Sequence, residues 1–147
     1  MTRHRRDRPP ASSELVSSVM KRVRSKNTGP EVALRKLLFA AGARFRVQYR
    51  PKGVAIGRST IDIAFVSKKL AIFVDGCFWH GCPEHGAIPK ANREWWAEKL
   101  RKNRERDEKV TEILTAAGWT VLRFWTHHSP EYMSVVVLEH INFEERQ

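Results

Sequence analysis

The clearest pattern in this chain is a pair of short apolar runs on either side of a polar turn. Residues 60–66 (TIDIAFV) are apolar apart from Asp62, and residues 70–75 (LAIFVD) are apolar up to their final acid. Residues 67–69 (SKK) lie between them and predict a tight turn. Strands this apolar belong in the centre of a sheet, so we expect a buried antiparallel hairpin. Such a hairpin places Asp62, near the start of one strand, close to Asp75 at the end of the other.

Helical spacing of apolar residues predicts four helices around the hairpin. They are expected over residues 13–23, 28–41, 92–117 and 129–138. Thr28 and Glu31 have the spacing of a capping box, and Asn92 is expected to cap the long third helix. Gly42 and Gly118 follow the second and third helices as natural C-terminal stops.

Two further strands complete the expected fold. Residues 44–49 alternate in strand fashion and place Phe45, Val47 and Tyr49 on one face, and residues 119–125 (WTVLRFW) form a second apolar run. The order ααβββαβα, without internal repeats, predicts one α/β (α+β) domain over residues 14–147, with a mixed sheet flanked by helices. Residues 1–13 are rich in Arg and Pro and predict a disordered basic arm.

Composition narrows the class of protein. The 147 residues carry a formal net charge of +11, which is typical of a protein with a polyanionic partner such as nucleic acid. A generally basic soluble protein is the alternative, and charge alone does not separate the two. No apolar stretch reaches the ~20 residues needed to cross a bilayer, and the N-terminal segment lacks the apolar region of a secretory signal. The two cysteines are too few and too close for a disulfide scaffold. We therefore expect a cytoplasmic protein that does not bind membranes.

A short segment after the hairpin gathers potential metal ligands. Cys77, Cys82 and His85 fall within nine residues, and His127 follows the last strand. Four Cys and His ligands are what structural Zn²⁺ requires, and a metal would order a loop with little apolar content. The alternative is a pair of buried free cysteines with incidental surface histidines. His128, adjacent to His127, is a competing candidate for the fourth ligand.

The acids and a histidine suggest a second, catalytic metal. Two carboxylates that converge at one sheet edge, Asp62 and Asp75, offer the oxygen ligands that Mg²⁺ prefers. Bound Mg²⁺ assists phosphodiester cleavage, with Glu31 as an outer acid and His80 as a general base. The alternative is that Asp62 pairs with one of the arginines and Asp75 only caps a turn.

Aromatic residues flank the same segment. Phe78 and Trp79 lie in a glycine-flanked loop, and Trp96 lies at the start of the long helix. Rings near basic residues stack on bases or wedge between them, although such residues more commonly belong to a core.

These motifs resemble those of a known family. The sequences VDGCFWHGCPEH, NREWWAEKLRKNRERD and GWTVLRFW resemble the very short patch repair (Vsr) DNA mismatch endonucleases, and the match runs from about Met20 to His127. The resemblance implies a core of the PD-(D/E)xK restriction-endonuclease type. It also implies an enzyme that nicks one strand 5′ of the thymine at a T:G mismatch, the product of 5-methylcytosine deamination, with Mg²⁺ as catalytic ion.

The resemblance also implies roles for individual residues. Asp62 matches the metal-binding aspartate, and the backbone at Val74 with the neighbouring Asp75 matches the second metal position. His80 matches the general base, and Glu31 matches an acid from the N-terminal helix. The residues at or next to the structural zinc ligands are Cys77, Cys82, His85 and His127. The residues that match DNA-inserting positions are Phe78, Trp79, Trp96 and Met20.

Two positions depart from the family pattern. Many members have Pro where this chain has Ile61, and some have His where it has Asp75, so Asp75 either binds metal directly or serves as a second acid. We expect a monomer that binds mismatched duplex DNA, with phosphate contacts from Lys21, Arg22, Arg24 and Lys26. Mismatch-repair proteins and a cytosine methylase pathway are its expected associates. A related nuclease of different specificity, or a non-catalytic zinc DNA-binding protein, are the alternatives.

Overall fold

A computed structural model of the chain describes residues 29–77, 82–84 and 88–145. Its elements are α2 (Gly29–Ala40), β1 (Arg46–Tyr49), β2 (Ile61–Phe65), the 3₁₀ helix η1 (Val66–Lys68), β3 (Leu70–Asp75), α3 (Arg93–Ala116), β4 (Thr120–Trp125) and α4 (Pro130–Glu145). From the second expected helix onward, this is the order that the hydrophobic pattern predicts. The expected arm and first helix, residues 1–23, lie outside the described residues.

The four strands form one mixed sheet in the order β1-β2-β3-β4. The first three are antiparallel, with Ile63 opposite Ile72 in the central hairpin. β4 returns parallel to β3, and Asp75 is paired with Trp125 at their carboxyl ends. Both hairpin strands are buried throughout, which confirms the expected mixed sheet and the central place of the hairpin.

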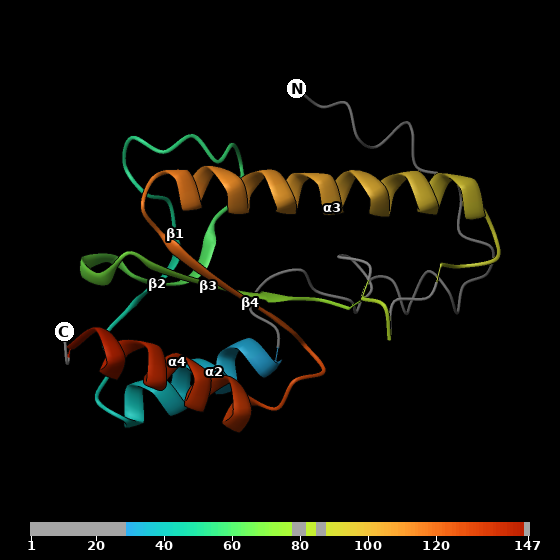
Figure 1. The fold of residues 1–147 in the computed structure, drawn as a ribbon. Helices are drawn as coiled ribbons and strands as arrows, with labels where there is room; N and C mark the ends of the chain where they lie inside the picture. The colour runs from blue at the N-terminus through green and yellow to red at the C-terminus, as the bar shows by residue number, and fades with distance from the viewer. Residues whose placement is uncertain (1–28, 78–81, 85–87, 146–147) are drawn as a thin grey trace.

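Helices cover both faces of the sheet (Figure 1). α2 and α4 lie side by side on one face, where Leu34, Leu38 and Met133 pack against the sheet. α3 crosses the opposite face and contributes Val110 and Leu114 to a second core. Its N-terminal half extends beyond the sheet, toward the end of β3 (Figure 1).

The helix ends follow the sequence in part. Gly42 and Gly118 adopt φ values of +89° and +90°, so the expected glycine stops are confirmed. Asn92 precedes α3 with φ +55° and its side chain makes no capping hydrogen bond, so the expected side-chain cap is wrong. Its carbonyl accepts from the Trp96 N–H at 3.0 Å. Within the described residues, no helix combines the length and the apolarity required to cross a bilayer.

The expected single face of Phe45, Val47 and Tyr49 is wrong. Phe45 packs against the core under α2 and α4, whereas Tyr49 packs against the core under α3. Gln48 lies between them with φ +48°, and this left-handed residue breaks the alternation of side chains along β1. Val47 is left 45% exposed at the sheet edge.

Candidate active site and metal centre

Asp62 and Asp75 line one cavity of about 210 Å³ at the end of the central hairpin. Asp62 comes from β2 and Asp75 is the last residue of β3, so the proximity expected from the antiparallel pairing is confirmed. Both acids are buried, at 8% and 7% exposure. Arg58 and Arg106 line the same cavity, so it combines acids inside with cations around them.

Asp62 is held by the backbone of the neighbouring strand. Its Oδ2 accepts a hydrogen bond of 2.8 Å from the Val74 N–H. Burial raises the pKa of Asp62 to about 7, helped by the negative charges of Glu31 and Asp75 and opposed by the Val74 N–H. A buried acid with this pKa marks a candidate functional group, because its environment disfavours the charged form.

Glu31 joins this cluster from the first turn of α2. It is 1% exposed, and its Oε2 accepts a hydrogen bond of 2.6 Å from Arg35 Nη2 one turn later. Glu31 raises the pKa of Asp62 both by its negative charge and by a hydrogen bond between the two side chains. Three acids from three separate elements therefore meet at one site, and a divalent cation would relieve their mutual repulsion.

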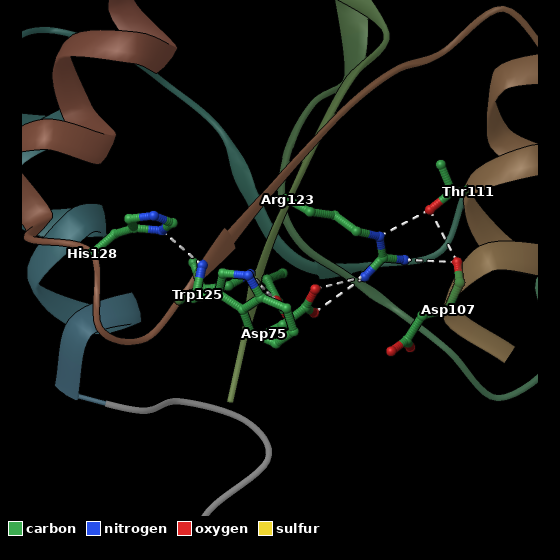
Figure 2. A network of polar contacts seen from close by, with 8 residues as sticks. Asp75, Asp107, Thr111, Arg123, Trp125 and His128 are labelled. Atoms are coloured by element: carbon green, nitrogen blue, oxygen red, sulfur yellow. Dashed lines mark hydrogen bonds and ion pairs between the residues drawn. The ribbon is translucent and has the colours of Figure 1, made fainter. Parts of the chain in front are cut away.

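Arg123 in β4 forms an ion pair with Asp75. The alternative left open by the sequence was an arginine partner for Asp62, not for Asp75. Its Nη1 donates to both carboxylate oxygens of Asp75 at 3.1 Å (Figure 2). The guanidinium also stacks on the Phe73 ring, with its carbon 4.1 Å from the ring centroid. Sequence reasoning missed Arg123. The available signal was an arginine inside an otherwise apolar strand, the same kind of signal that singled out Asp62.

Cys77, Cys82 and His127 gather into a second cluster beside the acids. Their candidate ligand atoms lie within 4.8 Å of one another. His127 Nδ1 is 3.3 Å from the Cys77 sulfur and 3.6 Å from the Cys82 sulfur. The parallel ends of β3 and β4 bring them together, since the Thr126 N–H donates to the Asp75 carbonyl at 3.0 Å.

The structure distinguishes the two adjacent histidines. His127 faces the cysteines, and its Nε2 lies 3.6 Å from a carboxylate oxygen of Glu84. The His128 ring lies against the His127 ring, with the ring centroids 4.5 Å apart, and its Nδ1 accepts from the Trp125 N–H at 2.9 Å (Figure 2). Its ring packs against Phe124 and Tyr132. Of the pair, His127 is therefore the one that lies with the sulfur atoms.

Both clusters fit the metals expected of them. Cys77 and Cys82 do not form a disulfide with each other. Their two sulfurs, together with an imidazole nitrogen, are donors that suit Zn²⁺. His85, expected as a further ligand, lies outside the described residues. The carboxylate oxygens of Asp62, Asp75 and Glu31 are hard donors that suit Mg²⁺.

Several expected functional residues lie outside the described part of the chain. They are Met20, Lys21, Arg22, Arg24, Lys26, Phe78, Trp79 and His80. Trp96 is described and is 8% exposed, with its ring in an edge contact with Trp95 at 4.8 Å. Its expected insertion into DNA stays a prediction, because the ring is buried in this structure.

Comparison with known proteins identifies relatives of this chain. The family model described as DNA mismatch endonuclease Vsr matches residues 12–84. The type II nicking enzyme V.NaeI of Lentzea aerocolonigenes is 48% identical over 71% of this chain, and the match spans 63% of that enzyme. The type II nicking enzyme V.XorIIP of Xanthomonas oryzae is 43% identical over 73% of this chain and 76% of its own length.

A mismatch endonuclease is also among the relatives. The DNA mismatch endonuclease Vsr of Escherichia coli is 34% identical over 74% of this chain and 67% of its own length. These matches extend across the hairpin that carries the acids, and the mixed sheet flanked by helices is the restriction-endonuclease-like fold of that group. By sequence and by fold, the chain belongs to the Vsr family of DNA mismatch endonucleases.

Proposed function

We propose that this chain is a Mg²⁺-dependent DNA endonuclease that nicks one strand 5′ of the thymine at a T:G mismatch. One observation supports it above the others. Asp62 and Asp75 line a single cavity whose rim carries Arg58 and Arg106, on a chain with a net charge of +11. Acids that bind a cation, beside arginines that bind phosphate, are the requirements for hydrolysis of a phosphodiester.

In this proposal, separate residues bind the metal and accept the proton. Asp62 and the Val74 backbone hold the Mg²⁺, with Asp75 either as a further ligand or as an outer acid, and Glu31 supports the cluster. Bound Mg²⁺ supplies charge stabilisation at the phosphate and lowers the pKa of a bound water. His80 accepts the proton of the attacking water as general base.

The cysteine cluster has a structural part in the same proposal. Residues 78–81, which include His80 and the two aromatics expected to enter DNA, lie in sequence between Cys77 and Cys82. The Cys82 N–H donates to the Cys77 carbonyl at 2.9 Å, so the two ends of that segment are held together. Zn²⁺ bound by both cysteines and His127 would lock those ends against β4.

The test is strand nicking on labelled duplexes that are identical except for one T:G or T:A pair, with and without Mg²⁺. The proposal expects Mg²⁺-dependent cleavage of the T:G duplex alone, on the 5′ side of the thymine. Equal cleavage of both duplexes would retain the nuclease and reject mismatch specificity. Binding without cleavage of either would favour the non-catalytic zinc DNA-binding alternative.

A second specificity is favoured by the names of the relatives. Those with 48% and 43% identity are named type II nicking enzymes, whereas the relative named for mismatch cleavage is 34% identical. A related nuclease with another mismatch or sequence preference is therefore the second candidate. A panel of all mismatches in several flanking contexts separates the two, because the first candidate cleaves at T:G and the second prefers another member.

A further inference from the structure

Arg123 is bound through all three of its guanidinium nitrogens. Nη1 donates to Asp75, Nε donates to Thr111 Oγ1 at 2.8 Å, and Nη2 donates to the Asp107 carbonyl at 3.1 Å (Figure 2). The last two partners belong to α3, so one side chain of β4 joins the acidic end of β3 to the long helix. A planar fork with several donors makes such a set of contacts, and the single ammonium of lysine does not.

Asp75 and Asp62 are held in different ways although they line the same cavity. Both oxygens of Asp75 accept from a cation at 3.1 Å, so its charge is balanced inside the protein. Asp62 accepts from a neutral amide, the Val74 N–H, through Oδ2. The arginine therefore compensates one of the two acids directly and leaves the other to be compensated by a cation from solution.

We propose that Arg123 is a positioning residue that keeps Asp75 as an outer carboxylate. In this arrangement Asp75 shapes the field of the site without binding the divalent cation, and Asp62 is the carboxylate that binds it. The inference rests on the proposed metal-dependent function and decides between the two roles left open for Asp75. The contacts with α3 serve the same role, because Thr111 and the Asp107 carbonyl hold the guanidinium in place.

The proposal makes an unusual demand on a variant that lacks the arginine. Loss of Arg123 removes a positive charge near the site and leaves the Asp75 carboxylate without that cation in the cavity that it lines. Both changes favour a divalent cation, by Coulomb's law at short range. Cation binding should therefore tighten while cleavage slows, because the released carboxylate draws the cation away from its productive position. A purely structural role predicts that binding and cleavage are lost together.

The first measurement is Mn²⁺ binding to the zinc-loaded full chain without DNA, read from the signal of free Mn²⁺ in electron paramagnetic resonance. Single-turnover nicking of the T:G duplex is measured in parallel. R123M should bind Mn²⁺ about tenfold more tightly and cleave at least about tenfold more slowly than wild type. R44M is the matched control, since Arg44 also stacks on a phenylalanine and donates to main-chain carbonyls, and it does not line the cavity of the acids.

The double variant D75N/R123M decides the question independently, and it removes the pair without leaving a buried charge. If Asp75 is an outer carboxylate, the double variant binds Mn²⁺ within about threefold of wild type, and D62N abolishes that binding. A loss of more than about tenfold in the double variant would identify Asp75 as a ligand and overturn the inference. Weaker Mn²⁺ binding by a folded R123M, checked by circular dichroism, would overturn it too.

Failure of the proposed function would give a different result. Wild-type protein that binds Mn²⁺ through Asp62 but nicks no duplex rejects the endonuclease proposal, while the binding data from the double variant still support or overturn the role of Arg123. Absence of Mn²⁺ binding by the wild type overturns the inference whatever the nicking assay shows.

Discussion

The carboxylate of Asp62 in β2 accepts a hydrogen bond of 2.8 Å from the backbone N–H of Val74 in β3. This bond favours the charged form of Asp62, but burial and two neighbouring acids outweigh it and raise the pKa to about 7. The acid is therefore oriented by one strand but poorly compensated in charge. Such a group gains most from a bound cation.

Replacement of Asp62 by Asn should abolish nicking and preserve DNA binding. The amide keeps the size of the side chain and removes the charge that attracts the cation, whose contribution of several kcal/mol corresponds to at least about a thousandfold in rate. Single-turnover cleavage and a binding assay in the absence of Mg²⁺ measure the two effects. E139Q, at an exposed acid of α4, is the control. Cleavage by D62N at the wild-type rate would show that the active site is elsewhere.

The stability of the protein without Mg²⁺ should fall as the pH rises from 5 to 8. The pKa of Asp62 is about 7 in the folded state and 3.8 without the protein environment, so the folded state holds the proton more tightly and loses that advantage as pH rises through 7. The contribution of this one group is on the order of 2 kcal/mol over that range. Urea unfolding at each pH measures it. D62N should show a smaller pH dependence, and an equal dependence in both proteins would contradict the assignment.

Replacement of His127 by Ala should lower the bound zinc, whereas H128A should retain it. Nδ1 of His127 lies 3.3 Å from the Cys77 sulfur, whereas Nδ1 of His128 is engaged by the Trp125 N–H. Loss of one ligand from a structural site weakens the metal and destabilises the segments that it joins. Elemental analysis of both purified variants provides the comparison. Equal zinc content in both would remove His127 from the ligand set.

Replacement of Arg106 by Gln should weaken the binding of duplex DNA by the same factor whatever the DNA sequence. Arg106 lines the acidic cavity from α3, where a DNA phosphate would approach. Each phosphate contact contributes about 0.9 to the slope of log affinity against log salt, so the variant should lose about one unit of slope. Binding titrations over a series of salt concentrations measure this slope. R44Q is the matched control, and a slope equal to that of wild type in R106Q would exclude the phosphate contact.

The sequence by itself determined most of the local structure and the positions of the acids. The hairpin, the long helix and the glycine stops follow from apolar periodicity and backbone preference, which are properties of neighbouring residues. The proximity of Asp62 and Asp75 followed from the same source, because the short turn at residues 66–69 forces the two strands to pair.

Only the tertiary structure decided which distant groups meet. The pairing of Arg123 with Asp75, the choice of His127 over its neighbour, and the left-handed Gln48 that separates Phe45 from Tyr49 are not encoded in any local pattern. An arginine inside an apolar strand predicts an acid nearby, but which acid it meets depends on the strand that pairs beside it. That pairing joins residues 48 positions apart, and it is established by the packing of the whole sheet between its helices.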